Sequence, residues 1–219
     1  MNTTTSGNLL LPLKDEVLGT LKSIDAPGAE GRDMVRHAIS SLNLLTVPTP
    51  RAGMRPEPVA RYGDELWALA RGMPTAGLAS KLLGAAEELV WHDAVSVYGP
   101  ADTPDLRAFN ETYFFTSLVA SPSRGRQEVW ASEDVMVAFT FQGPETLYPA
   151  HNHENEEFYI VVSGTCEWQR GDKRWRPMKP GDFLLHESLE PHAMRTGSEP
   201  LLCMCLWRAP FISTIKYVD

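Results

Sequence analysis

Histidine and glutamate side chains with the spacing of metal ligands gather in the second half of the chain. The segment that begins at His151 reads HNHENEEFY, and a Pro-His pair ends at His192. His151, His153 and His192 offer imidazole nitrogens and Glu157 offers a carboxylate, all of which bind divalent transition metals. Four such ligands leave positions open on a metal that prefers six, and open positions allow a substrate to bind. The sequence therefore predicts one catalytic metal site per chain.

The chain must reverse to bring these ligands together. His151 and His153 are two residues apart, so one strand directs both side chains to the same face. Glu157 lies about 13 Å beyond His153 if the strand stays extended, whereas ligand atoms lie about 2 Å from a metal ion. Residues 154–156 are polar and include an asparagine, which tolerates turn geometry. We therefore expect a tight turn at 154–156, after which Glu157 opens the next strand and faces the two imidazoles.

Strand periodicity also places other candidate residues. Tyr159 shares the face of Glu157 because side chains two apart on a strand point the same way. His192 must arrive from a separate strand. His186 ends another apolar run, and two interpretations of it stay open: a residue behind the ligands or in the pocket, or an ordinary buried histidine.

The character of the sequence changes near residue 111. Between residue 14 and about residue 93, apolar residues recur at helical spacing. Later segments are short, rich in β-branched and aromatic residues and separated by turn signals: 135–141, 157–162, 165–170, 183–186 and 201–207. This pattern is typical of a small antiparallel barrel or sandwich. We predict an α+β, mainly-β chain with a helical N-terminal extension at 1–115, packed on a β-barrel at 116–219 that carries the metal site.

Composition limits the partners of the protein. The chain has 219 residues and a formal net charge of -8, which argues against a broad phosphate-binding face and hence against nucleic acid as a partner. We find no apolar stretch of spanning length and no signal peptide, so we expect no membrane contact and a cytoplasmic location. Cys166, Cys203 and Cys205 form no disulfide framework, and we interpret them as reduced, buried residues on strands.

The metal-ligand segment resembles the first motif of the cupin superfamily. That motif reads glycine, spacer, His-x-His, three or four residues, glutamate, six residues, glycine. His151, His153, Glu157 and Gly164 match it with the expected gaps. The upstream glycine, Gly143, is two residues too far away.

The second cupin motif is also present, with two departures. Its Pro-Gly turn matches Pro180 and Gly181, and its histidine matches His192. The usual glycine three residues before that histidine is Leu189, and the usual asparagine four after it is Thr196. These departures concern loop geometry and not ligands. The match covers roughly residues 130–210 and implies a cupin barrel, and by analogy with other cupins we expect a homodimer.

A narrower resemblance is to the bacterial cupin lyases of dimethylsulfoniopropionate, the DddL/DddQ group. It is carried by Glu157-Phe-Tyr159, by the Tyr148-Pro-Ala lead-in, by the Pro-His-Ala-Met-Arg-Thr segment around His192, by Trp207 and by the N-terminal extension. The resemblance implies that Tyr159 is the catalytic base and that Tyr148, a second candidate catalytic residue, and Trp207 line the pocket. Some members use histidine where this chain has Glu157, so the ion could be Fe, Zn, Mn, Ni or Co.

The reaction implied is a β-elimination on a small zwitterionic sulfonium carboxylate. A divalent metal would stabilise charge on the substrate carboxylate, and a nearby cation favours the phenolate form of Tyr159. Aromatic faces would hold the sulfonium. The candidates are Trp207, Tyr148 and Phe141, with Phe139 beside it.

Two other functions stay open at this point. One is an iron-dependent cupin dioxygenase or isomerase that acts on another small carboxylate, since the ligand set alone does not separate it from a lyase. The other is a zinc-holding cupin sensor module whose N-terminal helices dock a partner. Activity without oxygen would distinguish the lyase from the dioxygenase.

Overall fold

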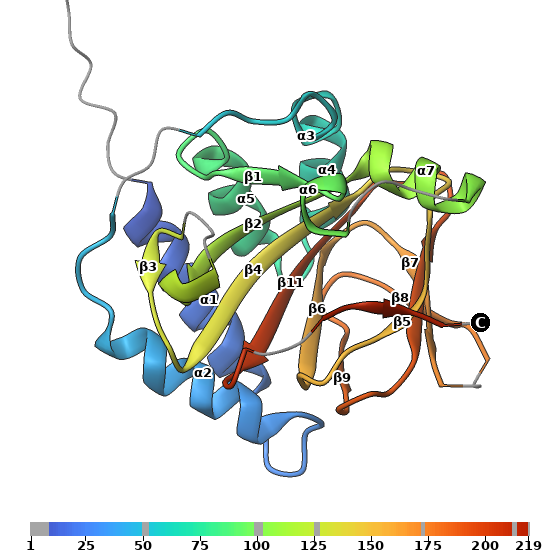
Figure 1. Ribbon diagram of the computed structural model, residues 1–219. Coiled ribbons are helices and arrows are strands. Elements are labelled where there is room, and N and C mark those ends of the chain that lie inside the picture. The colour runs from blue at the N-terminus through green and yellow to red at the C-terminus, as the bar shows by residue number, and fades with distance from the viewer. Residues whose placement is uncertain are drawn as a thin grey trace, which may run out of the picture.

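A larger and a smaller β-sheet face each other, and helices from the first part of the chain cover the outer face of the larger sheet (Figure 1). The computed structural model describes residues 9–49, 53–98, 103–124, 128–171, 174–211 and 214–218. Among these residues, no helix combines the length and the apolar character needed to cross a bilayer.

The helical layer forms where apolar residues recur at helical spacing. Its members are α1 (Leu10–Ile24), α2 (Arg32–Leu44), α3 (Glu57–Arg61), α4 (Gly63–Ala70) and α5 (Ala76–Ala85). On α2, for example, Val35, Ala38 and Leu42 are buried on one face and pack against β4 and β11. After these come α6 (Val95–Tyr98) and α7 (Pro104–Thr112), where the Thr103 hydroxyl caps the first turn by accepting a hydrogen bond from the Leu106 amide.

Each sheet collects strands from distant parts of the sequence. The larger has the order β1 (Trp91–Asp93), β2 (Tyr113–Ala120), β4 (Val135–Gln142), β11 (Leu201–Arg208), β6 (Glu157–Ser163) and β9 (Phe183–His186), with β3 (Trp130–Ala131) beside β2. The smaller has the order β12 (Lys216–Tyr217), β5 (Leu147–Asn152), β10 (His192–Thr196), β7 (Cys166–Arg170) and β8 (Arg176–Met178). A short 3₁₀ turn covers Pro122–Arg124.

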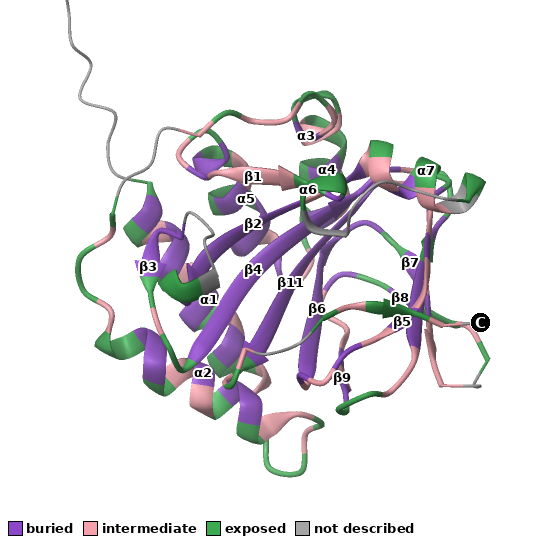
Figure 2. Ribbon diagram, in the orientation of Figure 1, coloured by how far each residue is buried: buried purple, intermediate pink, exposed green. Residues whose placement is uncertain are grey.

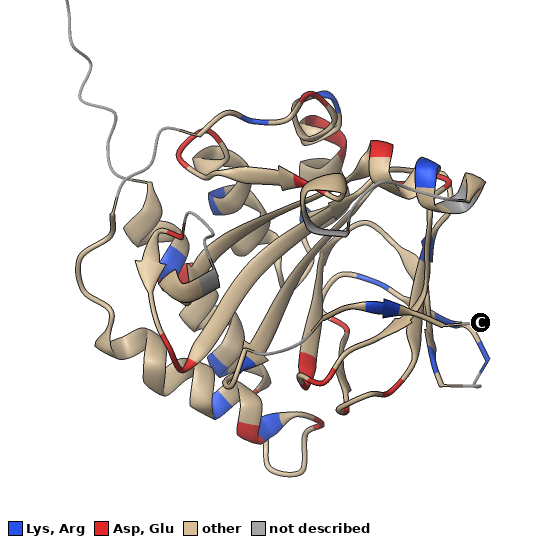
Figure 3. Ribbon diagram, viewed as in Figure 1, with Lys and Arg blue, Asp and Glu red and all other residues tan. Residues whose placement is uncertain are grey.

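The middle strands of the larger sheet are buried on both faces, as Figure 2 shows for β4 and β11. One face packs against the helices and the other faces the barrel interior. Figure 3 shows these strands almost without charged residues along their length. Burial on both faces explains why they read as nearly continuous apolar runs.

Alternation along β4 corrects one expectation. Phe139 and Phe141 lie in the core between the sheet and the helices, and Phe141 stacks on Tyr62. Met136 and Ala138, which point the other way, face the barrel interior. Phe141 therefore faces away from the barrel interior, and the prediction that it contacts substrate is wrong.

The predicted boundary between the helical extension and the barrel also needs correction. A division between residues 115 and 116 falls inside β2, and β1 lies still earlier in the chain and pairs with β2. Strand residues thus begin within the part expected to be helical. The helices and the larger sheet share one continuous core.

Candidate metal centre

The ligand candidates meet at one end of the barrel interior. His151 lies on β5, His153 follows directly after it, and Glu157 opens β6. Bends at 154–155 separate the two strands, as expected from the distance that Glu157 must travel back. His192 opens β10 and pairs with His151 across the smaller sheet.

The three histidines form a buried cluster. One nitrogen from each of His151, His153 and His192 lies within 4.8 Å of the others. The Nδ1 atoms are each held by a backbone carbonyl two residues away: His151 by Pro149 at 2.8 Å, His153 by Asn155 at 2.8 Å and His192 by Glu190 at 2.9 Å. Because a carbonyl only accepts, each Nδ1 carries the proton and each Nε2 is left with a lone pair.

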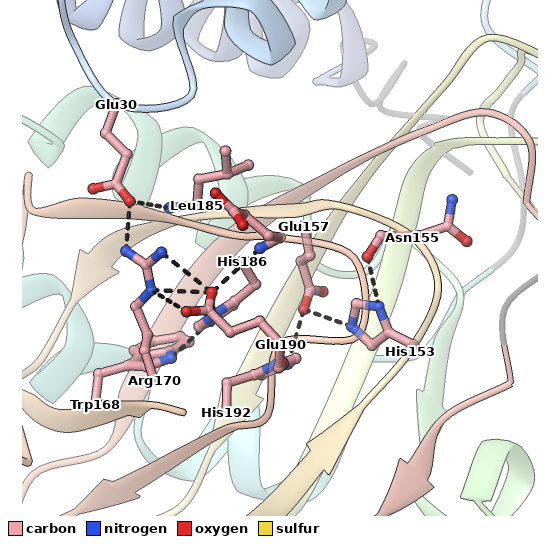
Figure 4. A network of polar contacts seen from close by, with 11 residues as sticks. Glu30, His153, Asn155, Glu157, Trp168, Arg170, Leu185, His186, Glu190 and His192 are labelled. Carbon is pink, nitrogen blue, oxygen red and sulfur yellow. Dashed lines mark hydrogen bonds and ion pairs between the residues drawn. The ribbon is translucent and has the colours of Figure 1, made fainter. Parts of the chain in front are cut away.

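Glu157 completes this group of donors (Figure 4). Its Oε2 lies 3.2 Å from Nε2 of His153 and 3.4 Å from Nε2 of His192. Nε2 of His192 is buried without a hydrogen-bond partner among the described residues. Acceptor lone pairs held this close and away from water need a proton or a cation between them. The residues therefore fit a divalent metal ion, and the donor set of imidazoles and a carboxylate suits a transition metal.

Electrostatics at the centre also suit a cation. Burial and the neighbouring His192 lower the pKa of His151 well below its usual value, so its ring stays neutral as a ligand must. Burial favours the acid form of Glu157, but contacts with His153 and His192 outweigh it and hold its pKa well below the usual value. Burial lowers the pKa of His153, but the hydrogen bond and the charge of Glu157 outweigh burial, so the pKa is raised overall.

Aromatic side chains enclose the ligands. The ring of Tyr148 stacks on His151 at 4.0 Å and on Phe109 at 4.2 Å, and the ring of Tyr113 lies 5.2 Å away. Trp207 lies 4.7 Å from the ring of His153 and donates its indole N–H to Oε1 of Glu157 at 2.6 Å. Trp207 therefore contacts a ligand candidate, Glu157, and the sequence did not indicate this contact.

Tyr159 faces the same small cavity as Glu157, as strand periodicity predicts. Burial, and then the charge of Glu157, raise the pKa of the Tyr159 phenol well above its usual value. Its ring packs against Trp168 at 4.7 Å. In the surroundings that the chain itself provides, this phenol is neutral at pH 7.

The cavity beside the ligand candidates is small, with a volume of about 30 Å³. Besides the predicted Tyr148, Glu157, Tyr159 and Trp207, it is lined by residues that the sequence analysis missed: Tyr113, Phe115, Met136, Ala138, Thr140, Cys205 and Ile215. Alternation along β2 places Tyr113 and Phe115 on one face, but the sequence predicted no strand before residue 135. Cys166, Cys203 and Cys205 are all buried, and none forms a disulfide, as expected.

The two departures from the second cupin motif are local. Leu189 has φ 62°, the left-handed conformation that glycine adopts readily, and its amide donates to the carbonyl of His153 at 2.8 Å. The Thr196 hydroxyl donates to the carbonyl of Gly143 at 2.6 Å and accepts from the Thr146 amide at 3.0 Å. Leu189 thus ties its loop to His153, whereas Thr196 ties the 143–146 loop at the other end of β10.

Comparison with known proteins gives a consistent picture. A family model described as dimethylsulfoniopropionate lyase matches residues 34–203, more than half of the chain. The curated protein dimethylsulfoniopropionate lyase DddQ of Ruegeria pomeroyi is 36% identical over 78 residues, which cover 35% of this chain and only 39% of that protein.

Solved structures show the fold. A chain from the crystal structures of the lyases RdDddP and RnDddQII superposes with a TM-score of 0.71 at 20% identity, covering 96% of this chain and 98% of that one. The crystal structure of DddQ from Ruegeria pomeroyi superposes with a TM-score of 0.67 at 20% identity, covering 94% and 96%. The predicted α+β cupin fold with helices before the barrel is confirmed.

Proposed function

The chain belongs to the dimethylsulfoniopropionate lyase family, and we propose that it cleaves dimethylsulfoniopropionate to dimethyl sulfide and acrylate with one bound divalent metal ion. The observation that carries this proposal is the buried cluster of His151, His153 and His192 beside Glu157, next to a cavity that Tyr159 also lines. We propose Glu157 as the fourth ligand because its Oε2 faces two ligand nitrogens.

The chain's own residues divide the remaining work. When bound, the metal ion supplies positive charge that stabilises the substrate carboxylate as the adjacent carbon loses its proton. The phenolate oxygen of Tyr159 takes that proton. The electron pair of the broken C–H bond forms the C=C bond of acrylate, and the C–S electrons leave with sulfur as neutral dimethyl sulfide. The sulfonium is a good leaving group, so no general acid is required.

Ionisation of Tyr159 depends on positive charge in the site. Without it, burial and Glu157 favour the neutral phenol. A metal ion, when bound, and the sulfonium group of the substrate would both act in the opposite direction, since opposite charges nearby favour the ionised form. The base is then active chiefly when the site is loaded.

The aromatic residues have different proposed roles from those expected. Both faces of Tyr148 are covered, by His151 and by Phe109, so Tyr148 steadies a ligand and offers only its edge to the cavity. Trp207 and Tyr113 remain as aromatic candidates for contact with the sulfonium. Because the cavity is small, we propose that its lining moves apart when substrate enters.

The test is headspace gas chromatography of dimethyl sulfide from purified, metal-loaded protein given dimethylsulfoniopropionate. We expect release without oxygen, loss of release after chelation and recovery on adding back a divalent metal. Activity that requires oxygen would instead favour the dioxygenase, and metal binding without turnover of any sulfonium acid would favour the sensor module. A homodimer and a cytoplasmic location stay predictions.

A further inference from the structure

A further buried histidine, His186, lies directly behind the metal centre. Its ring stacks on that of His192 with centroids 3.8 Å apart and planes 13° apart. His186 ends β9, where its backbone is also the cross-strand neighbour of Glu157. His186 thus stacks on one ligand candidate, His192, and is paired across the sheet with another, Glu157.

The orientation of the His186 ring is fixed from its far side. The indole N–H of Trp168 donates to Nε2 of His186 at 2.9 Å (Figure 4). Nε2 therefore acts as an acceptor, and the proton of the neutral ring lies on Nδ1. Nδ1 faces Oε2 of Glu190 at 3.7 Å, an electrostatic contact that is too long for a hydrogen bond.

Glu190 joins this ring to the ligand loop. Its backbone carbonyl accepts from Nδ1 of His192 at 2.9 Å. Its carboxylate accepts from the Glu187 amide at 3.2 Å and from the guanidinium of Arg170 at 3.2 Å. A carboxylate held from several directions fixes the residue, and thereby the carbonyl that orients the imidazole of His192.

The network continues to the helical layer. Arg170 also contacts Glu30 at 2.5 Å, and Glu30 lies between α1 and α2 and accepts from the Leu185 amide at 3.4 Å. Figure 4 shows Glu30, Arg170, Glu190 and His186 in a row that ends at His192. The N-terminal helices are in this way connected to a ligand in the barrel.

We infer that His186 and the Glu190 carboxylate are positioning residues that together hold the His192 imidazole in the geometry needed for metal binding. This inference rests on the metal site of the proposed function and not on its substrate. His186 contacts His192 and not the ion, so its effect reaches the metal through that ligand. Groups that orient metal ligands contribute about 10–100-fold to metal affinity.

The experiment measures Co²⁺ binding to the full chain by calorimetry and by the visible absorption of the bound ion. Glu190→Gln should weaken Co²⁺ binding by about tenfold or more and change the absorption bands. Glu187→Gln is the matched control, because it makes the same change on the same turn at an exposed side chain. Equal affinities and spectra for Glu190→Gln and Glu187→Gln would overturn the inference.

A second pair of variants tests the ring itself. His186→Leu should weaken Co²⁺ binding by about tenfold, and His186→Phe, which keeps a flat ring against His192, should recover part of that loss. Wild-type affinity in His186→Leu contradicts the inference. If the wild type binds Co²⁺ without releasing dimethyl sulfide, the proposed function fails while these comparisons still decide the role of His186. If the wild type does not bind Co²⁺, both the proposed function and the inference about His186 are wrong.

Discussion

The indole nitrogen of Trp207 lies 2.6 Å from Oε1 of Glu157 and donates its hydrogen to that carboxylate. Both side chains are buried, and the other oxygen of Glu157 faces His153 and His192. Hydrogen bonds to an ionised group are stronger than neutral ones, and a second bond partner fixes the direction in which the carboxylate points. Trp207 is therefore placed to aim Glu157 at the metal.

Trp207→Phe should separate this contact from simple packing. The variant keeps an aromatic ring beside His153 but removes the donor, so we expect metal affinity to fall by about tenfold with a smaller change in thermal stability. Metal titration with thermal melting of the same sample is the measurement. An unchanged metal affinity would leave Trp207 as a pocket-lining residue alone.

Tyr159→Phe should separate metal binding from chemistry. The variant removes the hydroxyl and keeps the ring against Trp168, so metal content should match the wild type. Turnover should fall by about 100-fold or more, the scale of a general base. Steady-state release of dimethyl sulfide together with elemental analysis checks both parts, and near-normal turnover contradicts the role of Tyr159.

Stability of the metal-free protein should fall in mild acid because of His186. Burial lowers the pKa of His186 from 6.5 to about 4. Between these values the unfolded chain binds a proton that the folded chain does not, so the free energy of unfolding decreases as the pH falls from about 6.5 to about 4. The full effect is on the order of 3 kcal/mol.

Urea unfolding at several pH values tests this expectation. His186→Gln should lower stability near pH 7 and reduce its dependence on pH between 6.5 and 4, the window that the shift defines. Equal slopes in the wild type and in His186→Gln would contradict the assignment to His186.

Leu189→Gly should stabilise the protein or leave it unchanged. Leu189 is 51% exposed and holds φ 62°, a conformation that costs a non-glycine residue about 1–2 kcal/mol. Glycine removes that strain, but it also makes the unfolded chain more flexible by about 0.4–1 kcal/mol. Thermal melting should show an equal or higher midpoint, and a clear decrease would mean that the Leu189 side chain has a packing role.

The ligand geometry could be predicted from the sequence because distance alone required it. No extended strand brings Glu157 near His153, so the sequence required a turn at 154–156. Because side chains two apart on a strand share a face, Tyr159 then had to lie on the same side as Glu157. The choice of Phe141 rests only on its aromatic character, and its side of the sheet could not be predicted because the larger sheet is covered on both faces. Apolar residues alternate on β4 without showing which face is the barrel interior.

Contacts between residues far apart in the sequence could not be predicted from any local sequence pattern. Glu30 and Arg170 are 140 residues apart, and nothing in the local sequence around either indicates the other. Likewise, Trp207 and Glu157 meet because β11 and β6 are paired in the larger sheet. The helix packing that brings Glu30 to Arg170 and the strand order that pairs β11 with β6 both depend on the whole fold and not on a motif.

Each ligand imidazole is already tethered through its far nitrogen to the peptide backbone. The direction of each donor is thus set by the peptide chain that carries it. A substitution that shifted the backbone at Asn155 or Glu190 would turn a donor away from the others even with every imidazole still present.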